Sequence, residues 1–157
     1  MNTKSIFITL TILLLTASSS FAGGPPCSAK SVSGDWGFVT TGWVIPAPGQ
    51  AVPVAAVARF TQDSAGNLQG GQDRSLGGHV GHETFKGTSD VKADCTAKNT
   101  VYVYDSSGNL ARTSVLDIVF TDGGNAAYVI FESITLPDGT PLPSVLTIQA
   151  QRISPTD

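Results

Sequence analysis

The sequence predicts an all-β fold, a small antiparallel up-and-down β-barrel of about eight strands. From residue 34 onward no segment shows a 3.6-residue apolar period, and polar and apolar side chains alternate instead. Gly, Asp, Asn and Pro interrupt this alternation at short, nearly uniform intervals, which is typical of hairpins. Barrel closure also removes the exposed strand edges that promote aggregation. A two-sheet sandwich is the alternative for the same number of strands.

The expected strands fill most of the chain after residue 34. Their approximate bounds are 35–44, 54–62, 67–76, 79–91, 96–104, 109–121, 125–136 and 144–153. Segments 63–68 and 105–110 have nearly the same sequence, Asp-Ser-x-Gly-Asn-Leu, and we interpret both as tight turns. The Asp side chain can accept turn N–H groups, and Gly adopts positive φ at little cost. Segment 121–125 predicts a third hairpin and 137–141 a longer turn.

Residues 1–22 have the parts of a secretory signal peptide. Lys4 is the basic residue, 6–15 is apolar apart from threonines, and the small residues that follow end at Ala22. The apolar part is shorter than the ~20 residues that span a bilayer. We therefore expect cleavage after Ala22, export, a secreted or periplasmic location and no membrane span in the mature protein.

The mature chain is expected to be one domain, with a short extended arm at 23–33 and the barrel at 34–157. Charged residues form 13% of the sequence, well below the usual figure of about 25%. Loss of Lys4 with the signal changes the net charge from −3 to about −4. Because no basic cluster exists, the sequence argues against binding to nucleic acid or to an anionic membrane surface.

The chain has two cysteines, Cys27 and Cys95. In an exported protein this even count predicts a disulfide between them. The alternative is a lipid on Cys27, but the preceding Gly-Pro-Pro does not resemble a lipobox. Either outcome removes cysteine as a candidate nucleophile.

Gly34-Asp35-Trp36 opens the first expected strand, and Arg152 lies near the end of the last. This pair resembles the signature of the calycin barrels, the lipocalins and their relatives. The resemblance implies that Trp36 closes one barrel end and that Arg152 packs over it. We expect neither the helix that follows the eighth lipocalin strand nor the tryptophan-rich strands of the avidins.

The opening Ser-Gly-Asp-Trp-Gly-Phe at 33–38, the D-x-x-G-N turns and the Asp-Cys-Thr step at 94–96 are also similar to secreted bacterial proteins of the allene-oxide-cyclase-like type. This resemblance implies an eight-stranded barrel with an apolar cavity. Members of that group bind small hydrophobic molecules or fold a substrate for cyclisation. The alternative for Gly34-Asp35-Trp36 is that it is only a strand start with a buried aromatic residue.

Both histidines lie in His79-Val80-Gly81-His82-Glu83. On a strand, His79 and His82 point to opposite faces, and His79 lies about 13 Å from Glu83 on its own face. We therefore expect no metal site, unless a bulge at Gly81 brings the imidazoles together.

Glu132 is the candidate catalytic residue. It follows Phe131 in a strand with apolar residues on both faces, on the side of Tyr128, Ile130 and Ile134. An interior position would raise its pKa and suit it to general acid–base chemistry. A salt bridge with an arginine or a solvent-facing position is the alternative.

Other side chains are candidates for contact with an interior ligand. We select Arg59, Tyr102, Tyr104, Phe120 and Tyr128. Arg74 and Arg112 also lie within strands, where they could anchor a polar group inside or form salt bridges outside. The aromatic residues could equally be ordinary core.

No nucleotide, metal or nucleophile motif is present, so no cofactor is expected. The first hypothesis is an exported, non-enzymatic barrel that binds a small hydrophobic or amphipathic ligand. The alternatives are a cofactor-free cyclase or isomerase, and a filled barrel that acts as a surface or structural interaction protein through an exposed apolar face, Tyr128/Ile130 or Val129/Phe131. The sequence leaves open whether the protein forms a homo-oligomer.

Overall fold

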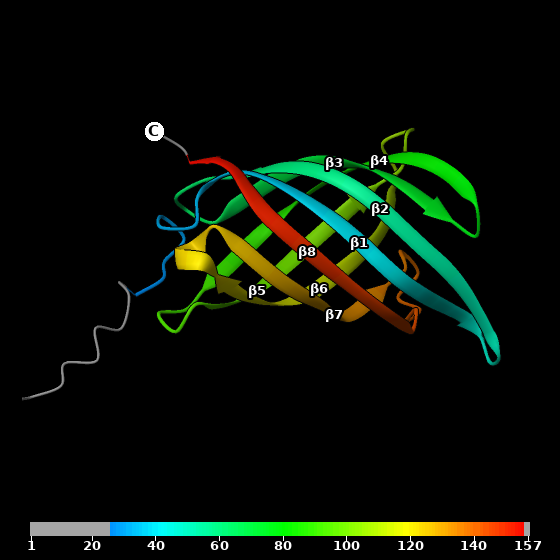
Figure 1. Cartoon of the computed structure of the whole chain (residues 1–157). Helices are drawn as coiled ribbons and strands as arrows, with labels where there is room; N and C mark the ends of the chain where they lie inside the picture. Colours follow the sequence, from blue (N-terminus) through cyan, green and yellow to red (C-terminus); the bar gives the residue numbers. More distant parts are fainter. Residues whose placement is uncertain (1–25, 156–157) are drawn as a thin grey trace, which may run out of the picture.

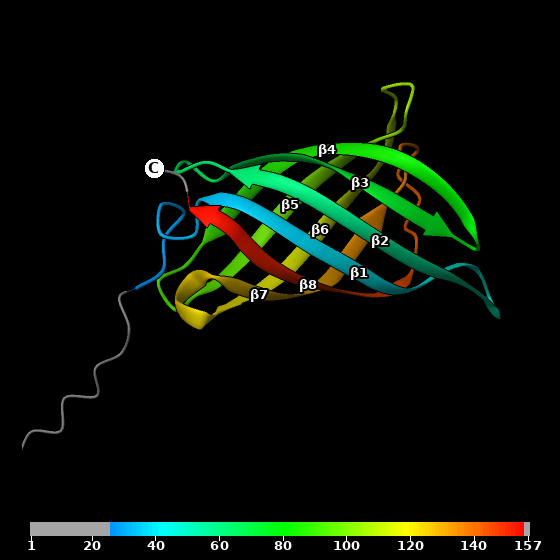
Figure 2. The ribbon, with the colours of Figure 1, turned by 45° about the horizontal axis from the view of Figure 1, so that its top comes forward.

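The computed structural model describes residues 26–155 as a closed antiparallel barrel of eight strands (Figures 1 and 2). The strands are β1 (Gly34–Ala47), β2 (Gln50–Gln62), β3 (Asn67–Leu76), β4 (His79–Val91), β5 (Thr96–Tyr104), β6 (Leu110–Thr121), β7 (Ala126–Thr135) and β8 (Ser144–Pro155). Each strand pairs with the next, and β8 pairs with β1. The predicted up-and-down barrel is confirmed. Within these residues no helix is long and apolar enough to cross a membrane.

The strand bounds follow the turn residues closely. β3, β4 and β5 have the predicted bounds, whereas β1 and β2 form a longer hairpin than expected. The expected strand bounds left 45–53, which contains Pro46 and Pro48, outside the strands, but a register shift between Val44 and Ala47 lets the strands continue to the pair Ala47–Gln50. The hairpin therefore extends beyond the barrel wall (Figure 2).

The repeated Asp-Ser-x-Gly-Asn-Leu segments form the same turn twice. In each, Oδ1 of the aspartate, Asp63 or Asp105, accepts the N–H groups two and four residues later at 2.8–2.9 Å. Gly66 and Gly108 have φ of 88° and 82°, a region that favours glycine. These turns connect β2 to β3 and β5 to β6, so local chemistry fixes two of the strand connections.

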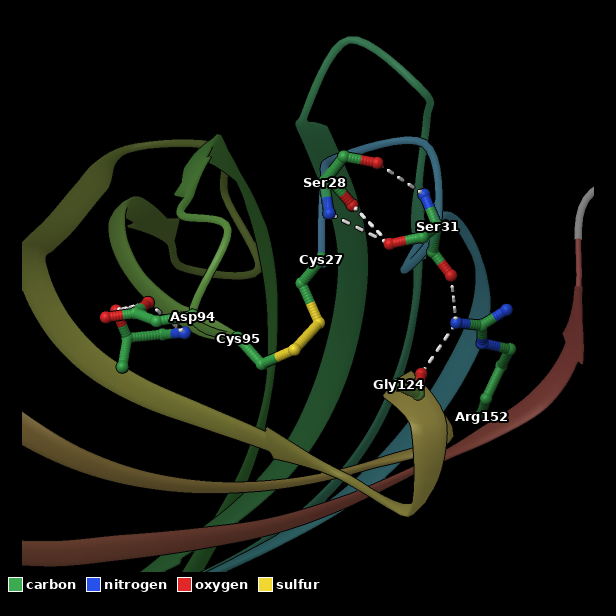
Figure 3. The surroundings of a disulfide bond; sticks show 8 residues. Cys27, Ser28, Ser31, Asp94, Cys95, Gly124 and Arg152 are labelled. Atoms are coloured by element: carbon green, nitrogen blue, oxygen red, sulfur yellow. Dashed lines mark hydrogen bonds between the residues drawn. A yellow bond between two sulfur atoms is a disulfide. The ribbon is translucent and has the colours of Figure 1, made fainter. Parts of the chain in front are cut away.

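One end of the barrel, which we call the Trp36 end, is closed by the N-terminal arm. Trp36 is 1% exposed, and its indole N–H donates to the Val32 carbonyl at 3.0 Å. The Arg152 guanidinium lies 5.5 Å above the Trp36 ring, the arrangement that the calycin resemblance implied. Arg152 also donates to the carbonyls of Ser31 and Gly124, at 2.6 Å each (Figure 3).

The predicted disulfide is confirmed and attaches this arm to the barrel. Cys27 and Cys95 are joined with their Cα atoms 4.9 Å apart (Figure 3). The described part of the arm is not extended as we expected. Ser28 and Ser31 exchange hydrogen bonds between side chain and backbone at 2.9 and 3.1 Å, which folds the arm into a turn. The expected signal peptide lies outside the described residues.

Candidate ligand cavity inside the barrel

A cavity of about 80 Å³ lies inside the barrel. Most of its wall is apolar and aromatic, with ring centroids of neighbouring side chains 5.9–6.3 Å apart. The aromatic wall residues are Trp36, Phe38, Phe60, Phe85, Phe120 and Phe131. A smaller part of the wall is polar. It consists of Thr40, Gln62, Gln72, Asn99, Arg112 and Ser114. An apolar wall with a few polar groups is typical of small-molecule sites.

Strand alternation and one glycine place these rings together. Trp36 and Phe38 are two residues apart on β1, so both point inward. Phe60 on β2 is paired with Gly70 on β3. A Cβ on Gly70 would lie 2.3 Å from the Arg59 carbonyl oxygen and 2.5 Å from the Cβ of Phe60, so any larger residue would force the β2 backbone to shift. Glycine at this position therefore permits the close approach of β3 to the strand that carries Phe60.

Glu83 is the carboxylate that lies inside the barrel, and its side chain is 5% exposed. Arg112 binds this carboxylate in a bidentate manner: its two terminal nitrogens donate to Oε1 at 2.9 Å and to Oε2 at 2.8 Å. Arg74 donates from Nε to Oε1 at 2.9 Å, and Gln72 donates from Nε2 to Oε2 at 2.6 Å. We call these four residues the Glu83 cluster. It joins β3 and β4 to β6, a strand that neither of them pairs with.

The Glu83 carboxyl group is held in its ionised form, because its pKa is lowered. Burial alone would raise the pKa of Glu83, but the hydrogen bonds and charge of Arg112, the bond from Gln72 and the charge of Arg74 outweigh it. Together they lower the pKa of Glu83 from 4.5 to about 2. Each carboxylate oxygen already accepts two hydrogen bonds. Such a group is a poor general acid or base near neutral pH, and its evident role is to fix the cavity wall.

The Glu83 cluster lies away from the Trp36 end. Trp36 is near the start of β1, and in an up-and-down barrel odd-numbered strands start at the end where even-numbered strands finish. Arg74 is near the finish of β3, while Glu83 and Arg112 lie in the first halves of β4 and β6. The cavity therefore extends from an aromatic floor at the Trp36 end toward Gln72 and Arg112, the two members of the Glu83 cluster that line it.

Glu132, the candidate catalytic residue, lies on the outside of the barrel with 47% of its side chain exposed. Its carboxylate accepts a hydrogen bond from Lys98, which also contacts Asp117 at 3.2 Å. Alternation explains the position, because Tyr128 and Ile130, on the same face as Glu132, are also exposed, by 61% and 55%. A β-bulge at Glu132 then turns Ile134, which the sequence placed on that face, to the interior. The desolvation that the acid–base hypothesis required for Glu132 is therefore absent.

Of the five side chains expected to contact an interior ligand, Phe120 alone lines the cavity. Tyr102 and Tyr128 are exposed by 42% and 61% on the outer surface. Tyr104 lies under the Lys86 ammonium at 5.3 Å, and Arg59 forms a surface salt bridge with Asp35 at 2.8 Å. Alternation explains the difference, because each of the four outward residues adjoins an inward one.

The remaining predicted residues divide between the two surfaces. Arg74 and Arg112 are the interior arginines, as one of the two alternatives proposed. His82 is exposed and lies 3.0 Å from Asp73, and His79 is exposed at the start of β4. In residues 26–155 no three His, Cys, Asp or Glu side chains are grouped so that they could hold a metal ion.

Comparison with known proteins shows the fold alone. No protein-family model and no curated protein sequence matches this chain. Among solved structures, the chain is similar to a redesigned β-barrel, mFAP1, bound to DFHBI. The match has a TM-score of 0.51 and 19% sequence identity, and it covers 80% of this chain and 98% of the redesigned barrel. The chain is thus a closed eight-stranded antiparallel barrel whose family is not identified.

Proposed function

We propose that this protein is an exported binding protein that holds a small hydrophobic or amphipathic ligand inside its barrel. The observation that carries the proposal is the interior cavity, with its aromatic wall and few polar groups. The redesigned barrel of similar fold is bound to DFHBI, which supports the idea that such an architecture can accommodate a small molecule.

The size of the cavity restricts the ligand. About 80 Å³ is well below the roughly 300–1,000 Å³ of common ligand pockets. A dry apolar cavity of about 150 Å³ holds benzene. We therefore expect a ligand no larger than a single ring or a short chain, admitted by a modest rotation of lining side chains such as Phe60 and Phe85.

Toluene is the probe that tests this proposal, because it is a single apolar ring. We expect calorimetric titration to give one saturable site per chain. Ala150→Leu adds volume at the cavity wall and should abolish binding, whereas Ala55→Leu makes the same change on the exposed face of β2 and should not. Ala127→Val is a milder filling variant if Ala150→Leu fails to fold. Equal binding by wild type and both filling variants would disprove an interior site.

The exported location is part of the proposal. The disulfide between Cys27 and Cys95 is consistent with an oxidising compartment. N-terminal sequencing of the protein from the periplasm or medium of a producing cell should begin at Gly23. A protein that retains Met1 and stays in the cytoplasm would contradict this location.

A further inference from the structure

Three polar side-chain atoms in the cavity wall have no hydrogen-bond partner within residues 26–155. They are Nε2 of Gln62, Oδ1 of Asn99 and Oγ of Ser114. These side chains are 2%, 6% and 2% exposed, and all three line the same cavity. They come from three strands, β2, β5 and β6. We call them the polar trio.

Because these three atoms are buried without a partner among the described residues, a molecule in the cavity that carries polar atoms would supply their missing hydrogen bonds. The large majority of buried side-chain polar atoms in native proteins are hydrogen-bonded to protein or to ordered water, because an unpaired one loses its hydration without compensation. An apolar side chain at each position would avoid that loss, and the neighbouring wall residues Leu68, Val101 and Leu116 are apolar. The polar trio is therefore unexplained by the packing of the barrel alone.

The chemistry of the polar trio indicates the group that fits it. The Gln62 amide nitrogen donates, the Asn99 amide oxygen accepts, and the Ser114 hydroxyl does either. A hydroxyl both donates and accepts, whereas a carbonyl or an ether only accepts and a hydrocarbon does neither. The trio carries no charge, and the nearest interior arginine, Arg112, already holds Glu83 with two hydrogen bonds. Nothing in the trio therefore compensates the charge of an anion.

We infer that the cavity selects a small uncharged molecule that carries a hydroxyl group, such as a phenol or a cyclic alcohol. The apolar part of the molecule packs among the aromatic rings and its hydroxyl pairs with the polar trio. This inference rests on the proposed function, since it names the ligand class for the same cavity.

Phenol and toluene form the matched pair of probes, because they have nearly the same size and differ in a hydroxyl and a methyl group. In an apolar cavity toluene binds better, because phenol loses hydration on entry. With the polar trio satisfied, we expect phenol to bind wild-type protein roughly tenfold more tightly than toluene, as about one additional hydrogen bond would give. Calorimetric titration of both probes measures this ratio.

Two variants assign the preference to the polar trio. Asn99→Leu and Gln62→Met should each reverse it toward toluene. Gln149→Met makes the same substitution at an exposed position of β8 and should leave the ratio unchanged. Neither interior variant should lower the melting temperature without ligand, because Gln62 Nε2 and Asn99 Oδ1 have no hydrogen-bond partner within residues 26–155.

The outcomes separate the inference from the proposed function. If toluene binds wild type as tightly as phenol or more tightly, the inferred ligand class is wrong and water molecules satisfy the hydrogen bonds of the polar trio. The proposed interior binding site would still stand in that case. If neither probe binds, the proposed function and the inference both fail. If phenol is preferred but Asn99→Leu and Gln62→Met keep that preference, the polar trio is not the recognition element and the inference fails.

Discussion

Replacement of Glu83 by glutamine tests whether the Glu83 cluster fixes the barrel. The change keeps the shape of the side chain and removes its charge, which leaves Arg74 and Arg112 without a counter-ion inside the barrel. The pKa of Glu83 falls from 4.5 to about 2 on folding, and at 1.36 kcal/mol per unit this corresponds to roughly 3 kcal/mol of stabilisation by the ionised form. Loss of one partner of a buried ion pair has a similar effect, about 3–5 kcal/mol.

The assay is urea unfolding of wild type and Glu83→Gln at a series of pH values. At pH 7 we expect the free energy of unfolding to fall by roughly 3 kcal/mol, a large fraction of the 5–15 kcal/mol typical of a domain. Because the pKa of Glu83 is lower in the folded state, its contribution is complete above about pH 4.5 and is lost as the pH falls toward 2. The difference between the two proteins should therefore shrink across that interval.

Glu132→Gln is the matched control, since Glu132 is an exposed carboxylate that contacts Lys98 on the outer surface. We expect it to change stability little, as for most exposed ion pairs. The reasoning is refuted if Glu83→Gln is as stable as wild type at pH 7, or if its deficit stays constant down to pH 2.

Three further perturbations have definite expected outcomes. Replacement of Cys27 and Cys95 by alanine opens a loop with a sequence separation of 68 residues and should lower the free energy of unfolding in urea by about 2–4 kcal/mol; an unchanged midpoint would contradict this. Gly70→Ala should push against the β2 backbone at Arg59 and Phe60 and lower the melting temperature, whereas Gly71→Ala, whose added Cβ meets nothing closer than 3.5 Å, should have a much smaller effect; equal losses would count against the close approach. Asp63→Ala and Asp105→Ala should lower the melting temperature by similar amounts, because both remove the same turn hydrogen bonds; a large difference would show that the two turns are not equivalent.

The fold could be predicted because its signals are local. The turn residues specify where strands end, and strands of uniform length joined by tight turns leave few alternatives to a meander. Asp63 and Asp105 accept the hydrogen bonds that their sequences predict. The β1–β2 hairpin was less predictable, because its extent depends on pairing past Pro46 and not on the turn itself.

The sequence predicted a carboxylate inside the barrel but chose the wrong residue and the wrong electrostatics. The interior carboxylate is Glu83 and not Glu132, and its arginine partners lower its pKa, whereas the acid–base hypothesis required a raised one. Glu132 lies outside because its whole strand face, with Tyr128 and Ile130, is exposed. Ile134 favoured the opposite assignment, but a single extra residue before it inverts the side to which it points. Phe131 and Ile134 both lie inside although they are three residues apart, and no sequence signal marks the bulge between them.

The sequence did contain a signal for Glu83. It shares a strand face with Phe85, while the opposite face carries His82 and Lys86. A face with an aromatic residue and no lysine is the better candidate for the interior. Arg112 likewise shares its face with Leu116. The pairing of Glu83 with arginines on β3 and β6 could not be derived, because it depends on the diameter and stagger of the closed barrel.

A crystal structure of the protein soaked with iodobenzene is the sharpest test of interior binding, because anomalous scattering locates the iodine. We expect an iodine peak inside the barrel, within contact distance of Phe38, Phe60 or Phe85. A peak confined to the outer surface, for example in the hollow beside Trp43 and Val145, with the interior unchanged, would contradict an interior binding site.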